Sequence, residues 1–336
     1  MRQLAAWAAA VSMGWLTGCD LAPQYHSPNF LLPASYQGAG PWQVAHPRDQ
    51  IPRGPWWRAY GNPTLNDLET QIPYNPNLLA QRESFRQARD LAAEAASGLY
   101  PHLGANFLMS ANRESPEQLW RSSNNTAPLT EASVEPSAAA SWEIDVWKRI
   151  GNETRAQKHR AQAQAADVAA VELILQAELA NAYLTLRGLD QNARLYRNVI
   201  NSYQKALDIT RMRLSDKIGS QLDVARAESQ LSSTRAQLND IMGQRALAQH
   251  AIATLIGQPA TGFVLPPQDA TPLHLPRIPT GMPSTLLERR PDIAAAERNM
   301  AAANAEIGVA RAAFYPNLSL NAIFGIIDRG FNIFSL

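Results

Sequence analysis

Apolar residues recur at alternating steps of four and three in the middle of the chain. The first series comprises Ala182, Leu186, Leu189, Ala193, Tyr196, Ile200, Tyr203 and Leu207. A second series, interrupted by Arg245, comprises Leu231, Leu238, Ile241, Ala248, Ile252 and Leu255. A period near 3.5 is typical of a coiled-coil seam. No proline, which costs about 3 kcal/mol inside a helix, occurs between Pro136 and Pro259. The pattern therefore predicts two long helices, over about residues 152–216 and 220–256.

The residues between these two helices predict a tight turn, formed by Ser215, Asp216, Lys217, Ile218, Gly219 and Ser220. We expect Gly219 to be the left-handed cap of the first helix and Ser220 to be the N-cap of the second. The first helix would be about 100 Å long at a rise of about 1.5 Å per residue. Because a small globular domain cannot enclose such a rod, we expect it to pair with its return helix and with other chains.

Two segments before the helical hairpin alternate between apolar and polar residues, over about residues 103–113 and 134–147. In the first, Leu103, Ala105, Phe107, Met109 and Ala111 alternate with Gly104, Asn106, Ser110 and Asn112, and Leu108 is the exception. In the second, Val134, Ala138, Ala140, Trp142, Ile144 and Val146 alternate with Glu135, Ser137, Ser141, Glu143 and Asp145. Such alternation is typical of a transmembrane β-strand, but it is also typical of any half-buried hairpin. The pattern alone leaves both interpretations open.

An internal repeat indicates how these segments are organised. Leu99-Tyr100-Pro101-His102-Leu103 recurs as Phe314-Tyr315-Pro316-Asn317-Leu318, and Asn75-Pro76-Asn77-Leu78 recurs as Arg290-Pro291-Asp292-Ile293. Both pairs share one offset of 215 residues (315 − 100 = 215). Self-similarity at a fixed offset indicates a duplicated unit. The unit consists of a helix, two strands, a long helix and its return helix, and the first helix of each copy begins at a proline.

The N-terminus resembles that of a bacterial lipoprotein. The apolar run from Leu4 to Leu16 is too short to span a bilayer comfortably as a helix. It ends in Leu16-Thr17-Gly18-Cys19, which resembles a lipobox. Cleavage would leave Cys19 as an acylated first residue, and because Cys19 is the only cysteine, disulfides within the chain are impossible. An ordinary signal peptide with a chance cysteine is the alternative.

Composition and charge narrow the range of functions. The net charge is +1, so the charge balance suggests no nucleic-acid partner. None of the six histidines has metal-ligand spacing with another, and no phosphate-binding loop or nucleophile motif occurs. Glu143 and Asp145 share a strand face and could form a catalytic pair. We prefer an acidic lining of a barrel or duct, which would weakly favour cations. We expect no enzyme, no metal site and no cofactor other than lipid on Cys19.

Several motifs together resemble the TolC/NodT-type outer-membrane efflux lipoproteins. They are the lipobox at Leu16–Cys19, Trp56-Trp57, Asn62-Pro63-Thr64-Leu65-Asn66-Asp67-Leu68, Ser141-Trp142-Glu143-Ile144-Asp145-Val146-Trp147, Ser220-Gln221-Leu222-Asp223-Val224-Ala225, Leu287-Glu288-Arg289-Arg290-Pro291-Asp292-Ile293, and Phe314-Tyr315-Pro316-Asn317-Leu318. This set extends over nearly the whole chain and is highly specific. One departure concerns the hairpin turn, where the family usually carries a glycine three residues before the serine and this chain carries Lys217.

The resemblance implies a mainly α-helical protein with a β-barrel part, in which three chains form one twelve-stranded barrel and a helical tunnel. It implies an outer-membrane channel, lipid-anchored with its helices in the periplasm, that exports small toxic compounds or drugs. Its expected partners are two further copies in a homotrimer, a periplasmic adaptor, an inner-membrane pump of the resistance-nodulation-division or a similar type, and outer-membrane lipid. The adaptor is expected to contact the hairpin tip, comprising Arg213, Leu214, Ser215, Asp216, Lys217, Ile218, Gly219 and Ser220. The alternative is an adaptor-like coiled-coil envelope lipoprotein.

The repeat also predicts how the chain is divided. Residues 1–18 are expected to form the signal peptide, residues 19–74 a Pro-rich tether and equatorial segment, and residues 75–289 the first repeat, with a connector at 258–283. Residues 290–336 then form an incomplete second repeat, whose hairpin tip would fall near residue ~435 and whose end near ~470 if the offset held. We therefore expect the 336 residues to be a C-terminally truncated form that does not close a barrel alone.

Overall fold

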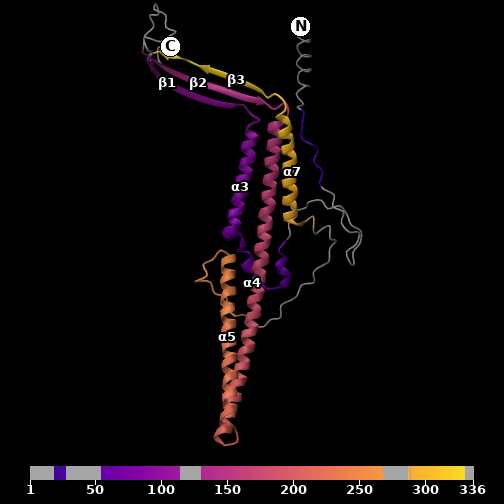
Figure 1. Cartoon of the computed structure of the whole chain (residues 1–336), viewed down its shortest axis with the longest axis vertical. Helices are drawn as coiled ribbons and strands as arrows, with labels where there is room; N and C mark the ends of the chain where they lie inside the picture. Colours follow the sequence, from indigo (N-terminus) through magenta and orange to yellow (C-terminus); the bar gives the residue numbers. More distant parts are fainter. Residues whose placement is uncertain (1–18, 28–53, 114–129, 268–286, 288, 330–336) are drawn as a thin grey trace, which may run out of the picture. The chain divides into compact units, whose positions relative to one another are not determined.

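The computed structural model describes residues 19–27, 54–113, 130–267, 287 and 289–329. The chain divides into two compact units (Figure 1). The first unit comprises Met1–Pro28, Gln87–Gln162 and Glu297–Leu336, and the second comprises Asn29–Arg86 and Ala163–Ala296. The expected signal peptide, residues 28–53 of the tether, most of the connector and residues 330–336 lie outside the described residues. None of the helices in the described ranges has the length and apolar character of a membrane span.

The elements follow one another in the order that the sequence predicts. They are η1 (Trp56–Tyr60), α2 (Pro63–Glu69), η2 (Ile72–Tyr74), α3 (Pro76–Ser97), β1 (His102–Arg113), β2 (Thr130–Ile144), α4 (Arg149–Ser215), α5 (Gln221–Leu255), α7 (Pro291–Ala312), β3 (Leu318–Gly325) and β4 (Asp328–Arg329). The two long helices match the expected ranges to within three residues at each end. The second strand begins earlier than expected and ends at Ile144, since the backbone turns at residues 145–148 before α4.

The first unit contains an antiparallel sheet in which β2 lies between β1 and the strands β3 and β4. Its register places apolar residues opposite one another, as in Leu103 opposite Ala140 and Ala138 opposite Phe324. The intervening pairs are mostly small or polar, as in Asn106 opposite Ser137. Because directly opposed residues share a sheet face, the sheet has one apolar face and one largely polar face.

Pro136 accounts for the break between β3 and β4. The register of β4 on β2 continues that of β3, which would place Ile326 opposite Pro136. Proline has no amide hydrogen and so cannot complete the ladder at this point. Ile326 N still donates to Pro136 O at 3.1 Å. We therefore regard β3 and β4 as one strand interrupted beside a proline.

The structure reproduces the internal repeat in its helices. Helices α3 and α7 both contain 22 residues, and each bound of α7 lies 215 positions after the corresponding bound of α3. Both are followed by a strand of the same sheet. The first helix and first strand of the duplicated unit therefore form twice, as the offset predicts.

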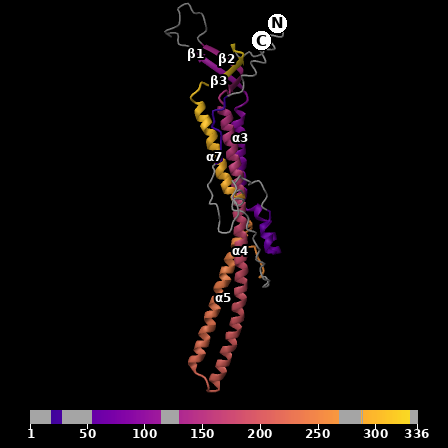
Figure 2. The same ribbon diagram turned by 90° about the vertical axis from the view of Figure 1, so that its right-hand side faces the viewer.

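The second unit contains the helical hairpin, in which α5 runs alongside the distal part of α4 (Figures 1 and 2). Near the turn, Leu207 of α4 packs with Val224 and Leu231 of α5. Farther from the turn, a larger core joins both helices to α2, η2 and α3. Its buried members are Leu65, Leu68, Ile72, Leu78, Leu175, Leu179, Ala180, Tyr183, Leu186, Ile252 and Ile256. Trp56 and Trp57 pack against this core.

Asn75 joins two helix ends in this core. Its side-chain Nδ2 donates to the carbonyl of Leu255 near the end of α5 at 2.8 Å. Its Oδ1 accepts from Asn77 N at 2.8 Å, at the start of α3. The side chain is buried. One amide therefore satisfies an orphan acceptor of one helix and an orphan donor of another.

The end of α4 differs from the prediction in one residue. Lys217, not Gly219, has the left-handed backbone conformation, with φ of 61°. Ile218 N donates to Arg213 O at 2.9 Å and Lys217 N donates to Leu214 O at 3.0 Å, which is the Schellman pattern with Lys217 at C′. The helix ends at Ser215, four residues before Gly219, so the left-handed C′ position falls on the lysine. This is the position where the family pattern carries glycine.

The start of α5 confirms the expected N-cap. Ser220 Oγ accepts from Asp223 N at 3.1 Å, and Asp223 Oδ2 accepts from Ser220 N at 3.3 Å. The two residues form a capping box. Hydrogen bonds from Ser220 hold the pKa of Asp223 below its ordinary value.

We predict that Lys217→Gly stabilises the chain by roughly 0.5–1 kcal/mol. Glycine adopts the left-handed conformation without the steric cost that a Cβ atom imposes. The measurement is urea unfolding followed by circular dichroism at 222 nm. Gly257→Lys is the matched reverse variant, because Gly257 ends α5 in the same conformation with φ of 73°. A Cβ at Gly257 would lie 2.9 Å from Tyr74 O, so this variant should be destabilised. Destabilisation by Lys217→Gly would contradict the prediction.

Glu69 gives a second prediction. Its side chain is 2% exposed, and among the described residues neither carboxyl oxygen has a hydrogen-bond partner. Burial raises the pKa of Glu69 from 4.5 to about 8. The folded chain then retains a proton that the unfolded chain loses, so stability should fall as the pH rises from about 5 to 8. The slope should be up to roughly 1.4 kcal/mol per pH unit. Glu69→Gln should reduce this slope in unfolding measured at several pH values, and an unchanged slope would refute the assignment.

Candidate functional site

The apolar sheet face is the first candidate surface. Its large side chains are exposed in the described chain: Leu103, Phe107, Met109, Leu318, Leu320 and Phe324. Within the described residues, the outer edges of β1 and β3 pair with no further strand. On the opposite face, Ser110 Oγ and Ser133 Oγ share a hydrogen bond of 2.8 Å. A sheet that is apolar on one face and polar on the other suits a boundary between hydrocarbon and water.

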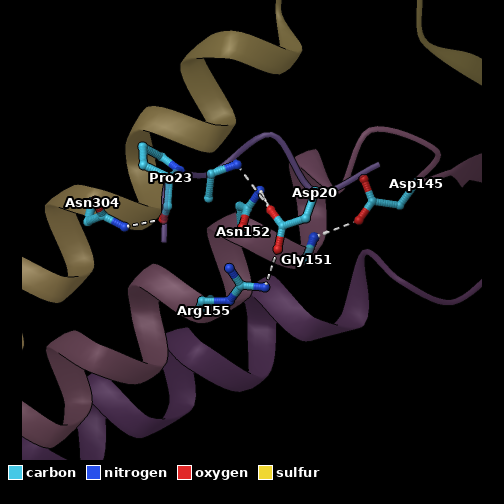
Figure 3. A network of polar contacts seen from close by, with 8 residues as sticks. Asp20, Pro23, Asp145, Gly151, Asn152, Arg155 and Asn304 are labelled. Atoms are coloured by element: carbon cyan, nitrogen blue, oxygen red, sulfur yellow. Dashed lines mark hydrogen bonds and ion pairs between the residues drawn. The ribbon is translucent and has the colours of Figure 1, made fainter. Parts of the chain in front are cut away.

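The joint between β2 and α4 uses both acidic residues that the sequence singled out. Asp145 Oδ1 accepts from Ile150 N at 3.0 Å, and its Oδ2 accepts from Gly151 N at 2.7 Å (Figure 3). Asp145 thus satisfies two of the amides that the first turn of a helix leaves unpaired. The carboxylate also carries negative charge at the positive end of the helix dipole. The structure gives Asp145 a helix-capping role that the sequence did not indicate.

Glu143 forms a bidentate ion pair with Arg149. The guanidinium donates from Nε to Oε1 at 3.0 Å and from Nη2 to Oε2 at 2.8 Å. The hydrogen bonds that Arg149 donates to Glu143 raise the pKa of its guanidinium above the ordinary value. The carboxylates of Glu143 and Asp145 are both half-buried, and both accept hydrogen bonds from groups of their own chain. The lining of a duct by Glu143 and Asp145 stays a prediction.

Two tryptophans bind the two copies of the repeated helix-to-strand turn. Trp142 Nε1 donates to Leu99 O at 3.1 Å, and Trp147 Nε1 donates to Pro316 O at 2.9 Å. Trp147 also stacks on Tyr315, with ring centroids 4.5 Å apart. The segment between β2 and α4 is therefore attached to both repeats.

A cavity of about 790 Å³ lies beside this joint. Its lining comes from α3, β1, β2, α4 and β3 and includes Glu94, Tyr100, His102, Trp142, Arg149 and Glu153. In the described part of the chain, no group of three or more His, Cys, Asp or Glu side chains is arranged to hold a metal ion. The lining combines the ion pair of Glu143 and Arg149 with both polar and apolar side chains.

The segment that begins at Cys19 is placed on the same unit. Cys19 is exposed. Asp20 binds Asn152 and Arg155 of α4, and Pro23 O accepts from Asn304 of α7 (Figure 3). These contacts carry no periodic signal in the sequence, because the partners are more than 130 residues apart. Lipid attachment at Cys19 stays a prediction.

The hairpin tip presents most of the residues predicted to contact an adaptor. Arg213, Ser215, Asp216, Lys217, Ile218 and Ser220 are exposed, whereas Leu214 and Gly219 are half-buried. A Cβ at Gly219 would lie 3.2 Å from backbone atoms of Arg213 and Leu214, so the glycine permits a close chain approach. Ile218 is 76% exposed, so the tip offers a large aliphatic side chain for contact with a partner.

Comparison with known proteins places these features in a family. The family model for outer membrane efflux proteins matches residues 72–258 and 282–330, well over half of the chain. The pyoverdine export outer membrane protein OpmQ of Pseudomonas aeruginosa is 33% identical over 269 residues, which cover 80% of this chain and 57% of OpmQ. The toluene efflux pump outer membrane protein TtgF of Pseudomonas putida is 30% identical over 323 residues, covering 92% of this chain and 65% of TtgF.

Solved structures show the same fold. The outer-membrane channel OprN superposes with a TM-score of 0.74 at 26% identity, covering 94% of this chain and 74% of OprN. The CmeC outer membrane channel of Campylobacter jejuni has a TM-score of 0.77 at 20% identity, covering 94% of this chain and 71% of CmeC. The chain spans less than two thirds of the length of OpmQ and TtgF. The matching family is one of outer-membrane channel proteins, not of enzymes, and the chain belongs to this outer membrane efflux protein family.

Proposed function

We propose that the chain belongs to a channel subunit of a tripartite efflux system, and that the channel is a passive duct across the bacterial outer membrane. The observation that carries this proposal is the sheet with one apolar and one polar face, joined through α4 to the helical hairpin. Lipid would cover the apolar face, and water in the duct would contact the polar face. The family membership and the OprN fold support the same conclusion.

The open edges of the sheet favour a homotrimer. Unpaired backbone groups facing hydrocarbon cost several kcal/mol each, so the strands of one chain require further strands at both edges. A twelve-stranded barrel of three copies requires four strands from each, one more than the described residues supply when β3 and β4 count as one. The exposed aliphatic residues along the helices, such as Ile174, Leu195 and Ile209, are available for contacts between the copies in the helical tunnel.

The proposed partners follow from the same architecture. A periplasmic adaptor would contact the tip around Ile218 and Lys217, and an inner-membrane pump of the resistance-nodulation-division or a similar type would supply the driving force. Lipid on Cys19 would anchor the chain in the outer membrane, with the helices in the periplasm. Relatives are named for the export of pyoverdine and toluene. We propose small organic compounds, including toxic compounds or drugs, as the substrate class.

A periplasmic adaptor is the alternative function, since adaptors also carry helical hairpins. The repeat disfavours it: α3 and α7 share one length and each precedes a strand of the same sheet. An adaptor would instead carry β-domain halves on both sides of a single hairpin.

The proposed assembly is tested by extraction from isolated outer membranes in mild detergent. We expect the full-length channel subunit to migrate as a trimer on an unheated gel and as a monomer after heating, because closed barrels resist detergent until they are heated. Cells without the gene serve as the control. A protein recovered only as a soluble monomer would contradict the channel proposal.

Adaptor contact at the tip is tested with a photoreactive amino acid placed at Ile218 in one strain and at Leu247 in another. Both side chains are large, aliphatic and well exposed, at 76% and 69%, but only Ile218 belongs to the tip. We expect a periplasmic adaptor to be captured from position 218 at several times the yield from position 247. Equal capture at both positions, or capture at position 247 alone, would refute the proposed contact.

A further inference from the structure

Residues 19–27 follow the expected cleavage site and lie along α7. Alternate residues of this segment, all half-buried, each form one hydrogen bond with the helix. These bonds join Leu21 O to Arg311 Nη1 at 3.2 Å, Pro23 O to Asn304 Nδ2 at 2.8 Å, and Tyr25 Oη to Glu297 O at 3.3 Å. The segment has no helical or strand structure of its own. Its position is therefore set by contacts with α7 rather than by local structure.

Asp20 connects the same segment to α4. Its Oδ2 accepts from Arg155 Nη2 at 2.8 Å, and its Oδ1 accepts from Asn152 Nδ2 at 3.0 Å (Figure 3). The amide of Ala22 also donates to Oδ1, at 3.1 Å. Burial opposes ionisation of Asp20, but the hydrogen bonds from these three residues outweigh it and lower the pKa of the carboxyl. Asp20 is therefore charged at neutral pH, with both oxygens engaged.

Gly308 provides the space in which the segment meets both helices. A Cβ atom at this position of α7 would lie 2.5 Å from Asn152 Nδ2 and 2.8 Å from Ala22 Cβ. Real side chains do not approach so closely, so any larger residue would displace the segment or separate α7 from α4. The glycine lets Asn152 reach Asp20 while Ala22 packs on α7.

A single exposed ion pair would be weak evidence, because such pairs contribute little and salt screens them. The side chain of Asp20 is 40% exposed, so its pairing with Arg155 alone would not hold nine residues. Here the contacts come from two helices, involve side chains and backbone carbonyls, and coincide with a glycine that makes room for them. Together these contacts form a site on α4 and α7 whose shape fits residues 19–27.

We propose that α4 and α7 form a docking site for the acylated start of the mature chain, with Asp20 as its positioning residue. The lipid itself rests on the proposed function, whereas the docking rests on the contacts. Asn152 directly follows Gly151, whose amide Asp145 caps, and is close in sequence to the end of β2. Docking therefore holds Cys19 beside the point where the sheet ends.

This position has a physical consequence for membrane attachment. One acyl chain alone binds a bilayer only marginally. An anchor fixed next to the strands acts at the same membrane surface as the sheet, and the two attachments reinforce each other through a high effective concentration. A freely moving segment would lower that effective concentration. Asp20 would thus couple the lipid anchor to the sheet.

The docking is tested with a nitroxide spin label on Gln24→Cys, in a Cys19→Ser background and also in the acylated chain. Gln24 lies within the segment and is exposed, so the label does not disturb the contacts. We expect a restricted electron paramagnetic resonance spectrum in the parent. In Asp20→Ala and in Arg155→Ala the label should move several-fold faster, and the double variant should be no more mobile than either single variant. Asp20→Asn, which keeps an acceptor for Asn152, should lie in between.

Arg160→Ala is the matched control, because Arg160 pairs with Glu306 between the same two helices without contacting residues 19–27. It should leave the label restricted, and circular dichroism should show equal helicity in all variants. Equal mobility in Asp20→Ala and its parent would overturn the proposal, as would loosening by Arg160→Ala of the same size. Palmitate labelling that depends on Cys19 tests the lipid separately. Its absence would contradict the anchor, while the spectra in the Cys19→Ser background would still decide the docking.

Discussion

The joint between β2 and α4 is the point on which the first unit depends. A strand takes its hydrogen-bond partners from neighbouring strands, whereas a helix leaves its first amides without partners. Asp145 directly follows the strand, and its carboxylate accepts hydrogen bonds from the amides of Ile150 and Gly151 in the first turn of α4. Lys148, in the left-handed conformation with φ of 56°, redirects the chain between them. A 67-residue helix can therefore follow the sheet after four residues.

The same joint also shows how a duplicated sequence becomes an asymmetric structure. The repeated helix-to-strand turns lie on either side of it, and a different tryptophan binds each turn. Trp142 binds the carbonyl of Leu99, and Trp147 binds the carbonyl of Pro316. The helix starts differ as well. Asn75 caps α3 and reaches the end of α5, whereas the equivalent Arg290 pairs with Asp292 two residues on. Each copy thus retains the backbone pattern of the unit while its contacts depend on its neighbours.

This difference explains which parts of the structure the sequence could predict. The long helices and the strand alternation follow from the spacing of apolar residues, which is a local property, and their bounds agree closely with the structure. The prediction of Gly219 as the left-handed residue of the tip was wrong. The left-handed position depends on where α4 ends, and helix ends are the least certain feature of a sequence pattern. The partners of Asp20, Asp145 and Asn75 carry no periodic signal. They emerge only when segments distant in sequence are placed side by side.

The interruption of the second seam by Arg245 illustrates the same limit. In the sequence, Arg245 interrupts an apolar series. In the structure, its side chain is buried and binds groups from two other segments of the chain. Arg245 binds Asp190 of α4 at 2.6 Å and the carbonyl of Leu265 at 2.7 Å. Removing one member of such a buried pair typically costs about 3–5 kcal/mol, whereas replacing both by apolar residues is often neutral. The pair is therefore weak evidence for added stability and better evidence for specificity.

An apolar seam of alanine and leucine tolerates sliding of one helix past another, because neighbouring positions are alike. A charge that must meet Asp190 of α4 favours one register of α5 against α4. That register determines which residues reach the turn. The position of Lys217 and Ile218 at the tip thus depends on a pair of charges far along the hairpin, as well as on the local capping motif.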